Sequence, residues 1–154
     1  MAKRVVVTGM GVISPIGNDV PTFWNNLVNG VCGIDYIQEF PTENLPVRIA
    51  GKVKDFHPEN YGMDKGFSRK QDLFTQYGVA AAYEAMNQAG LIAEGEGQNI
   101  DPFRLGVYVG SGIGGFEIQY RETAKMIEDP SGQWISPLFI PTMISNIAAG
   151  HIAI

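Results

Sequence analysis

Two short apolar runs in the chain have the composition of buried β-strands. Residues 4–9, RVVVTG, and residues 104–109, RLGVYV, are rich in β-branched, aromatic and other apolar side chains, and glycine lies at or next to the end of each run. Such runs are typical of the core strands of a layered protein. A third candidate, VRIAGKV at 47–53, lies within an irregular stretch, 31–67, that is rich in Pro, Gly, Asp and Asn. The pattern predicts two core strands and one outlying strand.

Capping signals predict helices between these strands. Asp19 is a candidate N-cap for a helix that ends at Gly30. Ser68 and Gln71 form an S-x-x-Q capping box, which predicts a long helix from this point to Ala89. Small residues are frequent in that helix and favour close packing against another element. They are Gly78, Ala80, Ala81, Ala82, Ala85 and Ala89.

Two further helices are expected towards the end of the chain. One runs from about Phe116 to Glu128, where Asp129 and Pro130 stop it, and the other lies in the apolar stretch 143–154. Strands that alternate with helices indicate an α/β protein with layered architecture. The chain ends in apolar sequence, so we expect that segment to be covered by a partner or by polypeptide of a longer protein.

Composition and charge narrow the function classes. The net charge of −5 argues against a nucleic-acid binder, and no apolar run approaches the ~18 residues of a membrane span. The N-terminal sequence reads as a first strand rather than a signal peptide. The single cysteine, Cys32, has no intramolecular disulfide partner, and this favours a reducing, cytoplasmic location.

The loop GSGIGG at 110–115 spells the dinucleotide-binding pattern G-x-G-x-x-G. That fingerprint also requires a second strand ending in Asp or Glu about 20 residues further on. The segment in that place, ISPLFIP at 135–141, contains two prolines and no terminal acid, so the βαβ unit is incomplete. The glycines therefore indicate a tight turn, or a backbone that a ligand or another chain approaches closely.

Four segments of the chain resemble a known family. RVVVTGMGVISPIGN, DLFTQYGVAAAYEAMNQAGL, LGVYVGSGIGG and SPLFIPTMISNIAAGHIAI look like the amino-terminal part of the bacterial β-ketoacyl-acyl-carrier-protein synthases of type II. The segments occur in the family's order and span almost the whole chain. The resemblance implies a thiolase-like α/β fold, with residues 1–154 forming most of the amino-terminal half of an α-β-α-β-α sandwich.

The same resemblance implies the chemistry of fatty-acid elongation. A cysteine at a helix N-terminus accepts an acyl group from acyl carrier protein, and two histidines assist decarboxylation of the malonyl thioester. In the family these three residues follow the segment at which this chain ends, so we expect no catalytic residue within it. Cys32 is expected to be a buried or half-buried thiol, His57 a surface loop residue and His151 a packed or capping residue of the last helix. No metal and no cofactor are expected.

The resemblance also implies binding residues. Ile113 in the glycine loop is expected to line the acyl pocket, and Phe139 and Ile140 to reach across a homodimer interface to the partner's pocket. Simple core packing is the alternative for Phe139 and Ile140. The basic cluster Lys65, Arg69 and Lys70 is expected to dock acyl carrier protein. Its apparent position at a helix N-terminus, which the helix macrodipole disfavours, favours such a use, and a solvated helix end is the alternative of equal weight.

Several functions remain open. The leading interpretation is an elongating condensing enzyme that acts on fatty acyl and malonyl thioesters as a homodimer. A polyketide ketosynthase is closely related to it. A non-catalytic half-domain that serves dimerisation or interaction is the alternative from another class, and a nucleotide-dependent dehydrogenase is the least favoured.

Overall fold

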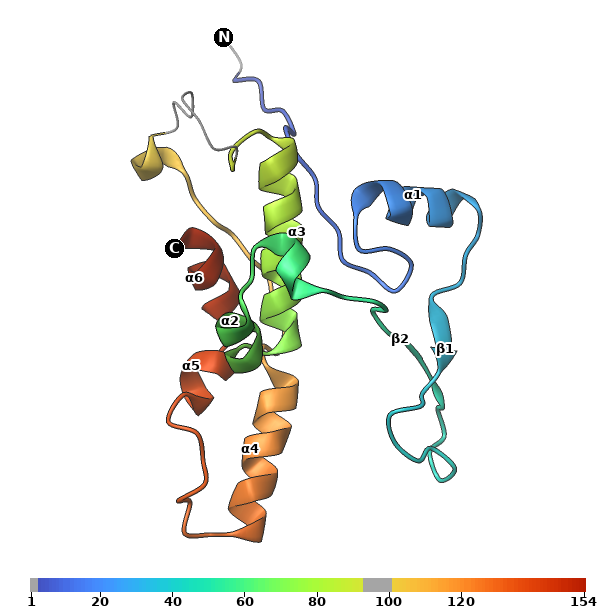
Figure 1. Ribbon diagram of the computed structural model, residues 1–154, viewed down its shortest axis with the longest axis vertical. Helices are drawn as coiled ribbons and strands as arrows, with labels where there is room; N and C mark the ends of the chain where they lie inside the picture. The colour runs from blue at the N-terminus through green and yellow to red at the C-terminus, as the bar shows by residue number, and fades with distance from the viewer. Residues whose placement is uncertain (1–2, 93–100) are drawn as a thin grey trace.

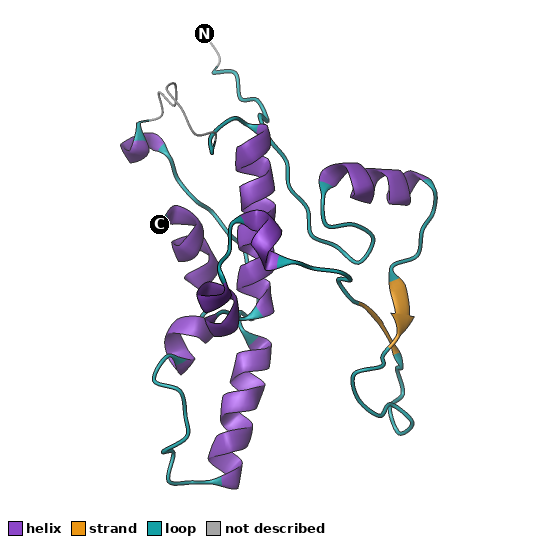
Figure 2. Ribbon diagram, viewed as in Figure 1, coloured by secondary structure: helices purple, strands orange, loops and turns teal. Residues whose placement is uncertain are grey.

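The computed structural model describes residues 3–92 and 101–154 as a set of helices around a long central helix (Figure 1). Figure 2 shows that helix and loop dominate and that the strands form one small hairpin. In chain order the elements are α1 (Val20–Val28), β1 (Ile34–Tyr36), β2 (Ile49–Gly51), the 3-10 turn η1 (Pro58–Tyr61), α2 (Lys65–Lys70), α3 (Leu73–Gln88), the 3-10 turn η2 (Pro102–Arg104), α4 (Phe116–Glu128), α5 (Phe139–Met143) and α6 (Ile147–Ala153).

Helix α3 lies at the centre, and its small residues permit close contacts on two sides. On one side it packs against α6, where Gly78 faces Ala148. On another side the N-terminal segment crosses it so closely that a Cβ on Gly11 would overlap the carbonyl oxygen of Ala81. The predicted close packing of this helix is therefore confirmed.

Polar side chains of α3 hold the N-terminal segment in place. The two carboxylate oxygens of Glu84 accept hydrogen bonds from Val12 N at 2.9 Å and from Val20 N at 2.7 Å. The Val20 amide lies in the first turn of α1, where backbone N–H groups lack intrahelical partners. Asp19 caps the same helix by accepting a bond from Thr22 N, as the sequence predicts.

The prediction of two core strands is wrong for this structure, because neither segment forms a strand. Residues 4–9 and 105–109 pair with no strand in the described part of the chain, and their side chains are largely exposed, with Val5 at 92% and Tyr108 at 98%. A β-branched run favours an extended backbone, but a strand also needs a neighbour for its N–H and C=O groups. The outlying strand at 47–53 is confirmed in part, because β2 pairs antiparallel with β1.

The predicted long helix at 68–89 is two helices. Asp64 caps α2 by accepting from Phe67 N, and Asp72 caps α3 by accepting from Phe74 N. Ser68 lies inside α2 and Gln71 is its C-cap, so the predicted capping box does not form. Aspartate is as good an N-cap as serine, and here two aspartates occupy the positions that matter.

The described residues bury little apolar surface. Their buried apolar side chains are Met63, Ala80, Ile118 and Ala148. The chain exposes 11679 Å², whereas a compact monomer of 16.8 kDa is expected to expose about 7,700 Å². Helix α6 is covered in part by α3, so the C-terminal apolar stretch is less open than expected, but other apolar segments lie uncovered. No described helix has both the length and the hydropathy of a membrane span.

Candidate functional site

The glycine loop 110–115 turns directly into α4 and packs against α5. Gly115 N donates a 2.8 Å hydrogen bond to Met143 O, and Gly114 N donates to Ser111 Oγ at 3.1 Å. Gly114 has φ +85°, and a Cβ at this position would overlap the Met143 carbonyl oxygen. Glycine at 114 is therefore required both by the left-handed backbone and by the close approach of α5.

The structure brings together the two segments that carry the predicted acyl-pocket residues. Ile113 lies at the exposed tip of the glycine loop, with 67% of its surface open. Phe139 begins α5 and is half-buried, and Ile140 follows it with 55% exposed. Because Gly115 bonds to the carbonyl of Met143 at the end of α5, the base of the loop lies against the end of this helix. We refer to the loop 110–115 together with α5 as the candidate acyl-binding face.

A buried carboxylate beside this face was missed by sequence reasoning. Asp72 is 7% exposed, and its Oδ2 accepts a 3.0 Å hydrogen bond from Ile118 N in the first turn of α4. Its Oδ1 accepts from Phe74 N at 3.3 Å. The carboxylate thus satisfies orphan amides of two helices, and each helix N-terminus favours its negative charge. The sequence feature that could have revealed Asp72 as an N-cap is its position directly before an apolar helical run.

The basic cluster lies on α2, and its position differs from the expectation. Lys65, Arg69 and Lys70 are all exposed, but Arg69 and Lys70 stand in the last turn of this helix. The helix macrodipole favours cations at that end, so the predicted unfavourable position is wrong for Arg69 and Lys70 and holds only for Lys65, the first residue of α2. The error follows from the misplaced helix boundary. Lys65 and Arg69 line a shallow cleft of about 360 Å³.

A second buried side chain on α3 holds the end of α2. Gln76 is 6% exposed, and its amide nitrogen donates to the carbonyl oxygens of Ser68 at 3.0 Å and Gln71 at 2.9 Å. These carbonyls belong to the C-terminal turn of α2, where the last C=O groups have no intrahelical partner. The glutamine side chain therefore fixes α2 to the first turn of α3.

Glu122 anchors the segment that leads to α5. This carboxylate is 2% exposed, and its two oxygens accept hydrogen bonds from Lys125 Nζ and Ser136 N, each at 2.8 Å. The pKa of Glu122 lies below its usual range, mainly because Lys125 and then the Ser136 amide donate hydrogen bonds to the carboxylate. Arg121 contributes more weakly in the same direction, and burial opposes the shift. The segment that carries Phe139 thus starts from a fixed point on α4.

The cysteine and the two histidines lie apart from this face. Cys32 is exposed, so the prediction of a buried or half-buried thiol was wrong, and its loop position beside β1 explains the exposure. His57 is on the surface, as predicted, 3.3 Å from Glu59. His151 packs edge-on against Phe67 with 5.0 Å between the ring centroids, in agreement with the prediction of a packed residue in the last helix. Within the described ranges, no group of three His, Cys, Asp or Glu side chains is arranged to hold a metal ion.

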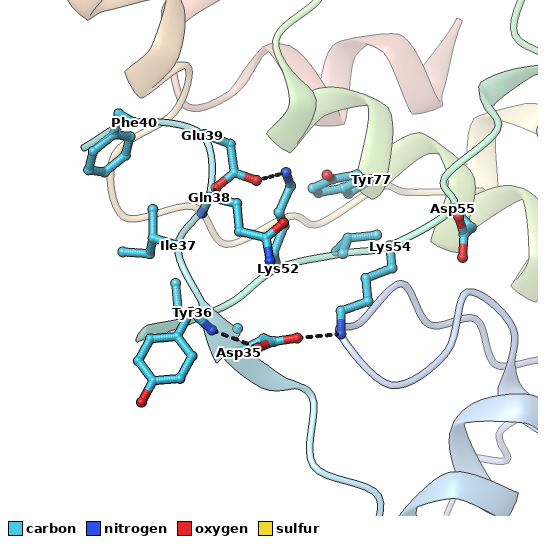
Figure 3. Close-up of a pocket in the computed structure, with 13 residues that line it drawn as sticks. Asp35, Tyr36, Ile37, Gln38, Glu39, Phe40, Lys52, Lys54, Asp55 and Tyr77 are labelled. Atoms are coloured by element: carbon cyan, nitrogen blue, oxygen red, sulfur yellow. Dashed lines mark hydrogen bonds and ion pairs between the residues drawn. The ribbon is translucent and has the colours of Figure 1, made fainter. Parts of the chain in front are cut away.

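A separate pocket lies between the β1–β2 hairpin and Tyr77 of α3 (Figure 3). It is an open pocket of about 840 Å³. Two ion pairs lie in it, Lys52 with Glu39 and Lys54 with Asp35, and Asp55 also lines it. The first pair lowers the pKa of Glu39. None of the predicted acyl-pocket or docking residues lines it, so this pocket is separate from the face around the glycine loop.

The chain belongs to the β-ketoacyl synthase family, whose N-terminal domain matches residues 2–154. It is 44% identical over 153 residues to 3-oxoacyl-(acyl-carrier-protein) synthase 2 of Staphylococcus aureus strain COL, and 44% identical over 152 residues to the synthase 2 of Vibrio cholerae. Each alignment covers 99% of this chain and 35% of the relative, so the chain spans about a third of the length of these curated relatives.

A solved structure supports the fold. The ketosynthase of a type II polyketide synthase, in complex with its acyl-carrier protein and bound to a hexaketide, superposes with a TM-score of 0.73 at 27% identity. The superposition covers 99% of this chain and 40% of that one. The predicted α/β class and thiolase-like ketosynthase fold are therefore confirmed, although residues 4–9 and 105–109 do not pair as strands in this structure.

Proposed function

We propose that this chain is the N-terminal domain of an elongating condensing enzyme of bacterial fatty-acid synthesis. The observation that carries the proposal is the 44% identity to 3-oxoacyl-(acyl-carrier-protein) synthases 2 over 99% of the chain. In the proposed reaction an enzyme thiolate takes the acyl group from its carrier thioester and releases the carrier thiol. Malonyl carrier thioester then loses CO₂, and the resulting carbanion attacks the acyl thioester to give a 3-oxoacyl carrier thioester and the free thiolate.

In this proposal the present chain supplies binding surface, and the nucleophile and its histidines lie in the remainder of the enzyme. Ile113 lines the acyl pocket, and Phe139 and Ile140 close the pocket of the partner subunit in a homodimer. The contact between the glycine loop and α5 supports this assignment, and so does the exposure of Ile113 and Ile140. Apolar side chains left open on a folded element favour burial of an acyl chain or a second subunit.

The proposed partner is acyl carrier protein, which docks on α2. The polyketide ketosynthase that matches this fold was solved in complex with its acyl-carrier protein. Lys65, Arg69 and Lys70 give α2 an exposed positive surface in a chain whose net charge is −5. Exposed charges of this kind speed encounter with an acidic partner more than they strengthen the final complex. The enzyme would act in the cytoplasm, without metal or cofactor.

Intact-protein mass spectrometry tests the proposal. The complete enzyme, incubated with acyl carrier protein that bears a saturated acyl group, is expected to gain one hydroxylamine-labile acyl adduct and then to convert malonyl carrier thioester to the 3-oxoacyl product. The 154-residue chain alone is expected to gain no adduct. A stoichiometric adduct on Cys32 of that chain, or no adduct on the complete enzyme, contradicts the proposal.

A second candidate is condensation in polyketide synthesis. The matching ketosynthase bound to a hexaketide favours it, but at 27% identity rather than 44%. The two functions differ in what happens after one condensation, because fatty-acid elongation requires reduction of each 3-oxo group before the next. An enzyme that extends its own 3-oxo product repeatedly, without a reductase, belongs to the polyketide class.

A non-catalytic interaction module is the third possibility. The open apolar surface of the chain is what such a module would use for pairing. In that case the complete protein would form dimers by sedimentation but would transfer no acyl group in the mass-spectrometric assay.

A further inference from the structure

The first turn of α3 carries two buried polar side chains that point to two different helices. Gln76 donates to the carbonyl oxygens of Ser68 and Gln71 at the C-terminus of α2. Asp72 accepts from the amide of Ile118 in the first turn of α4. Both side chains are more than nine-tenths buried. One turn of helix therefore ties the basic helix α2 to the helix that follows the glycine loop.

We propose that this turn, Asp72 to Gln76, is a joint through which docking of an acidic carrier protein on α2 sets the position of the glycine loop. The inference rests on the proposed function, which supplies the carrier for α2 and the acyl chain for the loop. Asp72 and Gln76 are positioning residues in this scheme, because each acts through the backbone of a neighbouring helix rather than on the substrate.

The contacts continue from the joint to the acyl-binding face without a break. Gly115 is the N-cap residue of α4, and a Cβ built on it would stand 3.1 Å from Asp72 Oδ2. The amide of the same glycine donates to Met143 O at the end of α5. A displacement of Asp72 therefore moves the base of the loop that carries Ile113, together with the helix that carries Ile140.

Two buried oxygens at the joint have no hydrogen-bond partner among the described residues. Thr75 is fully buried, and its Oγ1 has no hydrogen-bond partner among the described residues. The same holds for the buried Oε1 of Gln71, at the end of α2. A buried polar atom without a partner raises the free energy of the arrangement that contains it.

Hydrogen exchange in the complete enzyme tests the coupling directly. Carrier protein is added to the unmodified enzyme and to Asp72→Ser, and exchange is followed in the peptide that covers 110–118. Serine retains the N-cap of α3, but its hydroxyl is too short to reach the Ile118 amide as well. Carrier binding is expected to slow exchange in this peptide of the unmodified enzyme and to leave it unchanged in Asp72→Ser.

A kinetic comparison separates coupling from docking and from general damage. With Asp72→Ser, the Kd for carrier protein is expected to stay within about twofold of the unmodified value. The kcat/KM for a carrier-bound acyl group is expected to fall roughly five- to tenfold, which is the usual size of a lost coupling between two sites. The same acyl group on N-acetylcysteamine, which bypasses docking, measures any direct effect of the substitution on the acyl-binding face. Its kcat/KM is expected to fall several-fold less than that of the carrier-bound group, and equal losses for the two substrates would reject the coupling. Arg69→Glu is the contrasting variant, because it is expected to weaken carrier binding itself.

A second variant covers the possibility that Asp72→Ser does not fold. Gln76→Met keeps a long side chain of good helix propensity and removes the donors to α2, so it should abolish the carrier-dependent protection of 110–118 in the same way. Protection that survives in either folded variant, or that is absent in an unmodified enzyme that binds carrier, rejects the coupling and leaves the proposed function standing. An unmodified enzyme that binds no carrier rejects both.

Discussion

Asp72 and Ile118 lie 46 positions apart in the chain, and a 3.0 Å hydrogen bond joins the carboxylate of the first to the amide of the second. The same carboxylate caps its own helix through Phe74 N. A single buried side chain therefore completes the N-termini of both α3 and α4. Because the glycine loop ends where α4 begins, this bond also fixes the base of the candidate acyl-binding face.

Replacing this side chain is expected to destabilise the domain strongly. Asp72→Ala removes an N-cap and leaves the buried Ile118 amide without a partner, with an expected total loss of about 2–4 kcal/mol in the free energy of unfolding. Urea denaturation of the complete enzyme measures it. Asp64→Ala is the matched control, because Asp64 is an exposed N-cap with no second helix to satisfy, and about 1 kcal/mol is expected. Equal losses for the two variants would contradict the double role of Asp72.

The stability of the domain should depend on pH through Glu122. Its contacts with Lys125 and Ser136 lower its pKa in the folded state below the ordinary value of 4.5. The stabilisation is therefore complete above pH 4.5 and is lost as the pH falls through the lower folded-state pKa. Glu122→Gln keeps an acceptor for the Ser136 amide but cannot ionise, so it should be less stable at neutral pH and should approach the unmodified protein in acid.

Thermal melts between pH 7 and pH 3 provide the measurement. The difference in Tm between the two proteins is expected to shrink steadily below pH 4.5. The matched control is Glu128→Gln, since Glu128 is an exposed residue at the end of the same helix. A difference that stays constant over this range would show that the charge of Glu122 does not stabilise the fold.

The sequence predicted contacts between residues that are close together in the chain better than contacts between distant segments. The Asp19 cap and the His151 packing position follow from local pattern, and both are confirmed. The link from Asp72 to Ile118 joins distant segments, so no local pattern reveals it. The helix boundary at Gln71 was missed because serine and aspartate are equivalent caps. Because of that error, Arg69 and Lys70 were predicted at the wrong end of their helix.

The predicted strands failed for a related reason. The valines of residues 4–9 and the apolar residues of 105–109 show that these segments suit an extended, buried backbone, but a sheet exists only when a neighbouring strand supplies hydrogen bonds. No described segment pairs with either of them. The candidate acyl-pocket residues were located through the family resemblance, whereas the contact between the glycine loop and α5 emerged from the structure.

The basic helix should matter for the carrier and not for the chemistry. In the complete enzyme, Arg69→Glu combined with Lys70→Glu is expected to raise KM for carrier-bound substrates about tenfold with little change in kcat, because charge reversal weakens encounter and rim pairing. Salt screens exposed charges, so the effect should diminish at high ionic strength. Steady-state kinetics at low and high salt measure both.

A matched charge reversal on the hairpin provides the control. Arg48→Glu with Lys54→Glu changes the net charge by the same amount at exposed positions away from α2, and KM should change by less than about twofold. A KM that is unchanged by reversal at Arg69 and Lys70 at low ionic strength would show that the cluster only solvates the end of α2.

The tip of the glycine loop should limit the length of the acyl chain. Ile113→Phe replaces an aliphatic side chain with a larger aromatic one at the tip of the loop, where the distal methylenes of a long chain are proposed to pass. Overpacking of a filled channel costs about 1–3 kcal/mol, or roughly ten- to hundredfold in acylation rate for chains that reach the ring. Shorter chains should react at nearly the normal rate.

Phe139→Ala should act in the opposite sense by loosening the far end of the pocket. Acylation rates for a series of saturated chains in the complete enzyme measure both effects, with Ile127→Phe, on an exposed part of α4, as the matched control. If Ile113→Phe slows all chain lengths equally, Ile113 packs the interior of the assembled enzyme and does not line the acyl pocket.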